Sequence, residues 1–309
     1  MAQGLVSIGE AFEDVIFHGL PRLPRPGEEL RTTGFHRTFG GGTLITAVAA
    51  ARLGTPVTVV SALSAEAEQR LATEQVASVN LRTPREPHAV SVALSTRRDR
   101  AFVTFDGANA LLQARLLARF SSRLPRAAHV HVALGPEDPG AWVPLLQRMR
   151  ARGLTTSWDF GWHDDLPRRA GFAHLLRQID WVFLNEREAL HYAGTTQWAR
   201  ALSRWPTLAP HVVIKRGARG AVLLADGAEL RVPAVPVTVV DTTGAGDAFN
   251  GGFLAARLAG RPLDQCMRWG VLTGSLSTAQ AGGLDGLPTA NALRQELARH
   301  EAPRKERKA

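Results

Sequence analysis

A glycine-rich segment near residue 245 constrains the fold and the chemistry of this chain more than any other feature. It reads Asp-Thr-Thr-Gly-Ala-Gly-Asp from Asp241 to Asp247, and it joins a predicted strand, Val237 to Val240, to a predicted helix, Ala248 to Leu258. Small residues at the start of a helix let backbone N–H groups point at one spot, where the helix dipole favours an anion. The pattern therefore predicts a phosphate site with the Asp247 carboxylate at its mouth.

The chemistry expected of such a site is phosphoryl transfer to a hydroxyl group. A single carboxylate beside an anion hole can take the proton that an attacking hydroxyl loses. The alternative is a tight turn with a structural role alone, because a lone Gly-x-Gly is weak evidence. Asp241, two threonines and the following Asn250-Gly251-Gly252 add polar and small residues to the pattern, and they favour the functional interpretation.

The segment from Asp241 to Phe253 resembles the C-terminal signature of the ribokinase (PfkB) family of carbohydrate kinases. The resemblance implies that Asp247 is the catalytic base. It implies that the backbone of three small residues forms the anion hole: Gly244, Ala245 and Gly246. It also implies that Asp241 and Thr243 help to hold a monovalent cation, K⁺, under the loop.

Size and composition suit one large α/β domain or two small ones, since the chain has 309 residues of which 45% are hydrophobic. The start, Leu5 to Gly9, reads as a strand and not as a signal peptide, and no apolar segment is long enough to span a membrane. Cys266 is the one cysteine, which excludes an internal disulfide framework and fits a cytoplasmic protein.

The net charge of +9 suggests a polyanion as partner when it is taken alone. Arginine is spread along the whole chain, however, so we do not expect a nucleic-acid partner. The densest basic run lies in residues 299–309, which we expect to be a charged, disordered tail after a kinase domain of residues 1–298. Binding to a polyanion stays open as a charge-based alternative, and salt-dependent retention on nucleic acid would support it.

Predicted strands alternate with predicted helices through most of the chain, which favours a parallel sheet with helices on both faces. Residues 12–39 and 89–105 break this rhythm and look β-rich. They could form an ordinary edge hairpin or a small separate sheet. The family resemblance favours the second, so the expected fold is a ribokinase-like three-layer α/β sandwich with a mostly parallel sheet, a small β lid and a homodimer contact through that lid.

A second glycine run, from Gly40 to Gly42, opens an Ala-rich helix that ends Ala-Arg-Leu-Gly at Gly54. Such a run serves ligand approach or close packing equally well. It resembles the family's N-terminal signature, which implies that Gly40 and Gly41 lie by the sugar at the lid hinge. Asp14 would be a turn residue from its position alone, but its spacing resembles the family's sugar-binding aspartate.

The chain departs from the family pattern in two places. Ile45 stands where members usually carry an asparagine that binds a sugar hydroxyl, and an isoleucine side chain cannot form a hydrogen bond. Thr46 could substitute for it, or the substrate could lack that hydroxyl. The segment Ser61 to Glu66 also differs from the family's Gly-x-Asp pattern. Both departures leave the identity of the sugar open.

The C-terminal half carries the expected nucleotide site. Asn185 and Glu188 match the family's Asn-x-x-Glu motif, which implies a water-mediated Mg²⁺ site, although the same residues suit a helix N-cap. Gly217 and Gly220 match a region that lies against the nucleotide. Lys215 or Arg216 could meet a phosphate there, and the sequence does not choose between them.

The sequence thus indicates a kinase that uses ATP and Mg²⁺ to phosphorylate a hydroxyl of a sugar-like small molecule. The substrate could be a keto-deoxy sugar acid, a fructose-like sugar, a sugar phosphate or a nucleoside. The alternative outside catalysis is a degenerate protein that senses a sugar or a nucleotide, against which the Asp247 loop and the Asn185/Glu188 pair argue.

Overall fold

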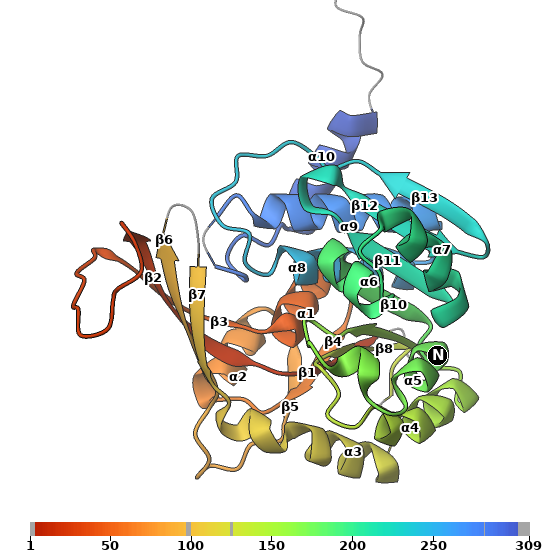
Figure 1. Ribbon diagram of the computed structural model, residues 1–309, viewed down its shortest axis with the longest axis horizontal. Helices are drawn as coiled ribbons and strands as arrows, with labels where there is room; N and C mark the ends of the chain where they lie inside the picture. Colours follow the sequence, from red (N-terminus) through yellow and green to blue (C-terminus); the bar gives the residue numbers. More distant parts are fainter. Residues whose placement is uncertain (1–3, 97–99, 124–125, 281, 302–309) are drawn as a thin grey trace, which may run out of the picture.

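The computed structural model describes residues 4–96, 100–123, 126–280 and 282–301. Its centre is a nine-stranded sheet that is parallel except at one edge (Figure 1). In spatial order the strands are β13 (Ala228–Val232), β12 (Ala221–Ala225), β11 (His211–Lys215), β10 (Trp181–Asn185), β9 (Thr155–Asp159), β8 (His129–Ala133), β1 (Leu5–Gly9), β4 (Val57–Ser61) and β5 (Ala77–Asn80). The pairs β11–β12 and β12–β13 are antiparallel.

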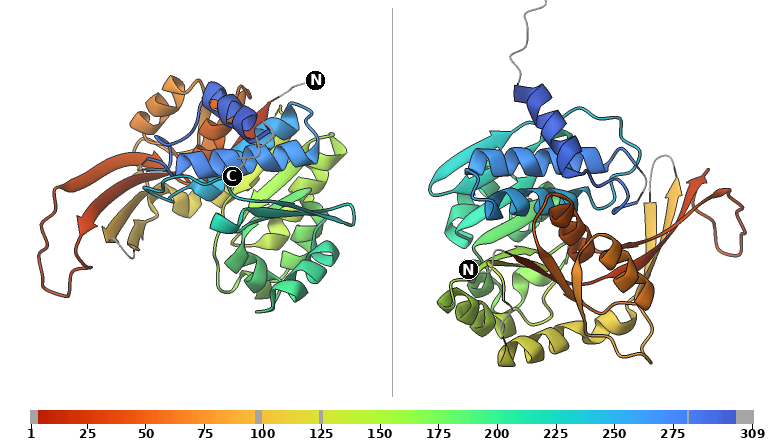
Figure 2. Two further views of the ribbon diagram at one scale, coloured as in Figure 1. Left: turned by 90° about the horizontal axis from the view of Figure 1, so that it is seen from above. Right: turned by 180° about the vertical axis from the view of Figure 1, so that it is seen from behind.

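Helices cover both faces of this sheet, because its inner strands are apolar on both sides. On β10, Val182 and Leu184 pack into one core, while Trp181 and Phe183 pack into the other. One face carries α1 (Gly42–Arg52), α2 (Ala65–Thr73), α8 (Ala245–Leu258) and α9 (Leu263–Ser277). The other carries α3 (Leu112–Ser122), α4 (Pro139–Ala151), α5 (Phe172–Gln178), α6 (Glu186–Tyr192) and α7 (Trp198–Leu208). The predicted three-layer α/β fold is confirmed (Figure 2).

Helix α8 packs on both sides through adjacent glycines. A Cβ atom on Gly251 would lie 2.5 Å from the Cβ of Ala49 in α1. A Cβ atom on Gly252 would lie 2.4 Å from Oγ1 of Thr273 in α9. Any larger side chain at either position would push the helices apart, so the two glycines fix α8 tightly between α1 and α9.

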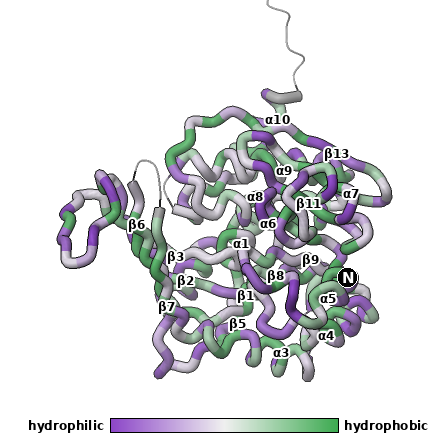
Figure 3. The backbone as a smooth tube through the Cα atoms, in the orientation of Figure 1, coloured by the Kyte–Doolittle hydropathy of each residue, from purple (hydrophilic) through white to green (hydrophobic). Residues whose placement is uncertain are grey.

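The lid is a separate four-stranded sheet that projects from the body (Figures 1 and 2). Its order is β3 (Gly34–Gly40), β2 (Phe12–Leu20), β6 (Val90–Thr96) and β7 (Arg100–Phe105). Asp14 lies on one face and Val15 on the other, because successive side chains of a strand alternate. The Val15 face also carries Phe35, Val103 and Phe105, which are all exposed, and the hydropathy colouring marks hydrophobic stretches along these strands (Figure 3).

Two local predictions are wrong. Val237 to Val240 is not a strand: the chain between β13 and α8 is irregular, and Val240 is 62% exposed. The amides of Val240 and Asp241 donate to the carbonyl oxygen of Thr278 at 2.8 and 3.1 Å, so this part of the chain is held against the end of α9 and not in the sheet. The helix α10 (Ala290–Glu301) continues past residue 298, where the disordered tail was expected to begin, and residues 302–309 lie outside the described part of the chain.

None of the described helices is both long and apolar enough to cross a membrane.

Candidate active site

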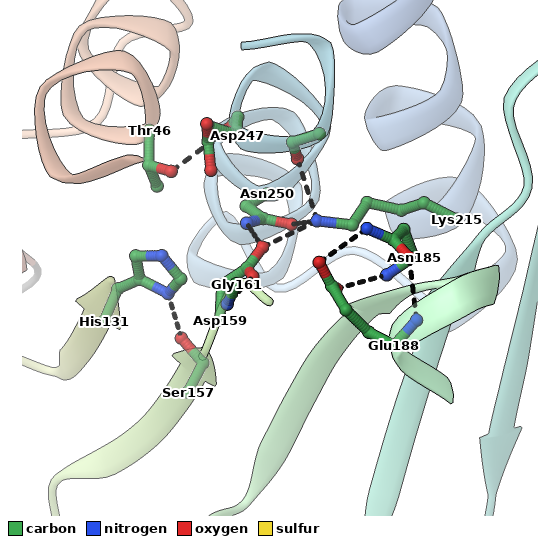
Figure 4. Close-up of polar contacts among 11 residues, drawn as sticks. Thr46, His131, Ser157, Asp159, Gly161, Asn185, Glu188, Lys215, Asp247 and Asn250 are labelled. Atoms are coloured by element: carbon green, nitrogen blue, oxygen red, sulfur yellow. Dashed lines mark hydrogen bonds and ion pairs between the residues drawn. The ribbon is translucent and has the colours of Figure 1, made fainter. Parts of the chain in front are cut away.

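Asp247 lies in the first turn of α8, which begins after Gly244. Gly244 has a φ of 71°, a left-handed conformation that glycine adopts without strain. The first amides of a helix have no acceptor within the helix and can therefore bind an anion. The Ala245 amide also donates to the carbonyl oxygen of Thr242 at 3.3 Å. The carbonyl oxygen of Asp247 accepts a hydrogen bond from Thr46 Oγ1 at 3.1 Å, which ties α8 to α1 (Figure 4).

The Asp247 carboxyl is poised to accept a proton near neutral pH. Burial and, to a smaller extent, the carboxylate of Asp159 raise its pKa to about 7, while Lys215 opposes the shift. A general base is most effective when its pKa lies near the working pH. The environment of Asp247 is therefore compatible with the role that the sequence suggested.

Asp159, Lys215 and Asn250 form a buried cluster beside Asp247 (Figure 4). Lys215 Nζ lies 2.7 Å from Asp159 Oδ2 and 3.2 Å from Asn250 Oδ1, and Asn250 Nδ2 donates to the same Asp159 oxygen at 2.8 Å. Burial acts to lower the pKa of Lys215, but the carboxylates of Asp159, Asp247 and Glu188 together more than offset this, so the pKa is raised and Lys215 stays charged. Lys215 in turn holds the pKa of Asp159 below its usual range despite burial.

His131 lies on β8 near this cluster, and its Nδ1 is 2.8 Å from Ser157 Oγ (Figure 4). Burial lowers the pKa of His131 to about 4. The ring is therefore uncharged at neutral pH, and a change of ionisation near pH 7 in this part of the site belongs to the carboxyl groups.

Asn185 and Glu188 are joined by reciprocal hydrogen bonds at the start of α6. The Glu188 amide donates to Asn185 Oδ1 at 2.9 Å, and the Asn185 amide donates to Glu188 Oε2 at 2.8 Å, which is a capping box. Burial raises the pKa of Glu188 to about 7, with a further contribution from Asp159. The pair thus stabilises the helix, and both residues also line the cavity described next.

A cavity of about 780 Å³ opens beside Asp247 and has the size of a small-molecule site. Polar groups from the ends of β9, β10 and β11 line one part, and an apolar wall that includes Val235, Val237 and Val271 lines another. The cavity brings together most of the predicted nucleotide and anion residues: Asn185, Glu188, Lys215, Gly217, Gly220, Ala245, Gly246 and Asp247. Gly244 adjoins it through the start of α8.

Lys215 and not Arg216 is directed at this cavity. The Arg216 guanidinium lies 4.1 Å from the ring centroid of Trp198 and 3.2 Å from a carboxylate oxygen of Glu186. A cation–π contact and an ion pair thus hold it on the flank of α6. Of the two candidates that the sequence left open, Lys215 is the one that lines the cavity.

The second glycine run lies between Asp14 and Asp247. A Cβ atom on Gly40 would lie 2.0 Å from Asp14 Oδ2, and one on Gly42 would lie 2.9 Å from Asp247 Oδ1. Gly41 has a φ of 95°, and a Cβ there would lie 2.5 Å from the carbonyl oxygen of Glu10. Burial raises the pKa of Asp14 to about 7, and Asp241 adds to the shift. The residues predicted to bind the sugar therefore lie next to the predicted base.

Asp241 organises the loop before α8. Its Oδ1 accepts hydrogen bonds from the amide of Thr243 at 2.9 Å and from Thr243 Oγ1 at 2.8 Å. Its Oδ2 accepts from the amide of Gly282 at 3.1 Å. These bonds join the Gly282 loop to the loop that was expected to hold the cation, and they also explain Asp241 and Thr243 as parts of a structural turn.

Sequence reasoning missed Asp159 and the role of Asn250. Asp159 ends a buried strand at the carboxyl edge of the sheet, where ligands of open α/β sheets bind. An acid at the end of an otherwise uncharged run from Thr155 to Phe160 was the available signal. Asn250 was seen as part of the glycine-rich pattern, but nothing in the sequence linked it to a lysine 35 positions away.

Comparison with known proteins identifies the family of this chain. Residues 2–290 match the model of the pfkB family carbohydrate kinases. The chain is 25% identical over 305 residues to the ribokinase of Haemophilus influenzae, which covers 94% of this chain and 96% of that protein. It is 38% identical over 145 residues to the cytidine kinase of Thermococcus kodakarensis, a match that spans 45% of this chain and 51% of that protein.

Solved structures have the same fold. The Arabidopsis thaliana ribokinase complexed with ribose and ATP has a TM-score of 0.76 at 25% identity, over 96% of this chain and 99% of that one. A putative ribokinase II from E. coli in complex with ATP and Mg²⁺ has a TM-score of 0.79 at 20% identity, over 97% of this chain and 100% of that one. The family match spans nearly the whole chain and includes the loop from Asp241 to Asp247 (the anion loop), the capping box and the second glycine run. The protein therefore belongs to the pfkB family of ATP-dependent carbohydrate kinases.

Proposed function

We propose that Asp247 is the general base with which this kinase transfers the γ-phosphoryl group of ATP to a hydroxyl of an uncharged, sugar-like small molecule. The observation that carries the proposal is the place of Asp247 between two sites. Its side chain lines the cavity of about 780 Å³, and its Oδ1 lies 2.9 Å from where a Cβ on Gly42 would be. A hydroxyl near the glycine run and a phosphate in the cavity would thus meet at one carboxylate.

The proposed reaction is an in-line displacement. The substrate oxygen forms a bond to the γ-phosphorus while the bond from that phosphorus to the β–γ bridging oxygen breaks, and ADP leaves with that electron pair. The hydroxyl proton passes to the Asp247 carboxylate. The first-turn amides after Gly244 and the Lys215 ammonium face the charge that develops on the phosphoryl oxygens.

Metal ions would assist from the cavity side. Glu188 presents carboxylate oxygen there, and Mg²⁺ favours oxygen ligands while keeping several of its waters. Glu188 therefore fits a Mg²⁺ ion that would arrive with ATP and neutralise its phosphates. For K⁺, Asp241 and Thr243 are the candidate residues, and replacing K⁺ by tetramethylammonium in the assay tests whether turnover requires it.

Carboxyl groups around the glycine run favour an uncharged substrate over a sugar acid or a sugar phosphate. Asp14 and Asp247 lie at the two ends of the run. The pKa of Glu10, whose carbonyl oxygen faces Gly41, is raised to about 7 by burial and by the nearby Asp106 and Glu137 carboxylates. An anionic substrate would be repelled by these groups, whereas sugar hydroxyls can donate to them. A nucleoside remains the second candidate because its ribose offers the same hydroxyls.

The exposed apolar face of the lid supports a homodimer through this sheet. Phe35, Val103 and Phe105 are 56%, 70% and 55% exposed on the face opposite Asp14, and a second copy of the sheet would cover them. A cytoplasmic location fits the free, buried thiol of Cys266.

Asp247→Asn tests the proposed base. ADP formation is measured across neutral sugars, sugar acids, sugar phosphates and nucleosides, and ATP binding is measured separately by calorimetry. The variant should bind ATP and lose on the order of 10²- to 10⁴-fold in kcat. Asp264→Asn, in the first turn of α9, is the matched control and should retain full turnover.

Two outcomes would contradict the proposal. Turnover of Asp247→Asn at the wild-type rate would exclude Asp247 as the base. Thermal stabilisation of the wild type by sugars and ATP without ADP formation from any of them would indicate a sensor.

A further inference from the structure

Ile45 lies in the first turn of α1, directly after the glycine run that borders Asp247. Its side chain is 3% exposed and belongs to the core between α1, α8 and the sheet. An isoleucine in this turn cannot bind a hydroxyl, so its role must follow from what it packs against.

The tip of the Ile45 side chain fills a slot between two glycines. A Cβ on Gly244 would lie 2.5 Å from Ile45 Cδ1, and a Cβ on Gly283 would lie 2.6 Å from the same atom. The two glycines also face each other, since the Cβ position of Gly244 is 3.3 Å from the Cα of Gly283. One methyl group of Ile45 therefore occupies the space that side chains at both glycines would need.

This contact joins three segments that build the active site. Ile45 follows the glycine run on the substrate side. Gly244 starts the helix whose first amides form the anion hole. Gly283 follows Gly282, whose amide donates to Asp241 and so ties that loop to the segment before α8. Interiors are close-packed and transmit displacements, so a change at Ile45 would move the Gly244 turn.

We propose that Ile45 is a positioning residue: its Cδ1 methyl holds the Gly244 turn against the Gly283 loop and thereby aims the first amides of α8 at the transferred phosphoryl group. The inference rests on the proposed function of this loop as an anion hole. Misplacement of catalytic donors by about 1 Å can cost on the order of 10²-fold in rate. Loss of this contact should therefore lower kcat while leaving the KM for ATP and for the sugar nearly unchanged.

Ile45→Val is the first test, because it removes Cδ1 alone. We expect kcat to fall about 10-fold, a fraction of the loss on misplacing the donors fully. Ile179→Val is the matched control: it shortens another fully buried isoleucine, at the end of α5, and should keep the wild-type kcat. Thermal melting of both variants separates a change in stability from a change in positioning.

Gly283→Ala provides a complementary test. Gly283 does not have a positive φ, so alanine fits its backbone, and the added Cβ would overlap Ile45 Cδ1. This variant should lose about 100-fold in kcat. The double variant Ile45→Val/Gly283→Ala replaces the isoleucine methyl with the alanine methyl, and its kcat should recover to within about 10-fold of wild type.

The outcomes separate this inference from the proposed function. A wild-type protein without kinase activity would contradict the proposed function. An active wild type overturns the inference if Ile45→Val leaves kcat unchanged, or if Ile45→Val fails to rescue Gly283→Ala.

Discussion

Lys215 and Asp159 form a buried ion pair, 2.7 Å from Nζ to Oδ2, that links the ends of β11 and β9 beneath the first turn of α8. Lys215 also donates to the carbonyl oxygen of Gly246 at 3.3 Å. The lysine that faces the cavity is thus held by one carboxylate while it supports the turn that carries Asp247. The charge of Asp159 consequently affects both the position of Lys215 and the basicity of Asp247.

Asp159→Asn should shift the pH dependence of turnover. The proposed base Asp247 can accept a proton only when it is ionised, so kcat/KM of the wild type should fall as the pH drops below its pKa of about 7. Asp159 raises that pKa, and its removal also leaves the Lys215 charge unopposed. Both effects lower the pKa of Asp247, so the acidic limb of the profile should move to lower pH while the maximal rate falls.

Asp180→Asn is the control for this prediction. Asp180 binds Thr156 at the opposite end of β9 and should leave the profile unchanged. An unchanged acidic limb in Asp159→Asn would show that the two carboxylates are not coupled.

Asp247→Asn should stabilise the fold more at high pH than at low pH. The folded pKa of Asp247, about 7, lies above its unfolded value of 3.8, so the folded state holds an extra proton between these values. The stability due to that proton is present below about pH 4 and is lost as the pH rises through about 7. Asparagine does not ionise and avoids the loss.

The measurement is the Tm of both proteins at pH 4.5 and pH 8. The Tm of the variant minus the Tm of the wild type should be larger at pH 8 than at pH 4.5. The difference should amount to roughly 2–4 °C for each kcal/mol of stability that the variant retains at pH 8 and the wild type loses. An equal gain at both values would contradict the raised pKa.

Gly40→Ala should weaken binding of the sugar. The new Cβ would lie 2.0 Å from Asp14 Oδ2 and would displace that carboxylate. We expect the KM for the sugar to rise on the order of 10- to 100-fold, while the Kd for ATP stays within about 2-fold of wild type, because the loss of a charged hydrogen bond costs about 1.5–3 kcal/mol. Gly54→Ala is the control. Gly54 has a φ of 92°, which strains an alanine, but nothing lies within 4 Å of its Cβ position, so this variant should lower stability without changing the KM for the sugar.

Val103→Asp should separate a lid-mediated dimer into monomers. Val103 is 70% exposed on the apolar lid face, and a carboxylate there could not be buried without large cost. Thr104→Asp places the same charge on the opposite face of β7 and should leave the dimer intact. Light scattering after size-exclusion chromatography measures the molar mass of the wild type and of both variants. A monomeric wild type would exclude the dimer.

The anion loop could be predicted because its information is contiguous. Asp241 to Asp247 contains the turn, the helix start and the carboxylate within one short segment. The Asp159–Lys215–Asn250 cluster could not, because its hydrogen bonds join residues 56 and 91 positions apart. Such pairs depend on which strands become neighbours in the sheet, and local pattern does not specify that order.

The incorrect strand at Val237 to Val240 has a different cause. Alternating valines favour a strand locally, but the end of this segment donates its backbone hydrogen bonds to Thr278 at the end of α9 and not to a neighbouring strand. Val239 instead lines the cavity, where an apolar side chain suits a flat ligand surface. The same valines that misled the prediction of structure therefore contribute to the candidate nucleotide site.

The adjacent glycines of α8 bear on how this kinase could be retargeted by protein engineering. Gly251 and Gly252 leave no room for a methyl group on either side of the helix that presents Asp247. Libraries that vary α8, α1 or α9 would therefore mostly yield inactive variants, since any added volume displaces the reactive end. The lid lies outside this packed helical unit, and the face of its sheet that carries Asp14 borders the candidate sugar site. Acceptance of a new sugar should be selected there, with the machinery for phosphoryl transfer left as an unaltered module.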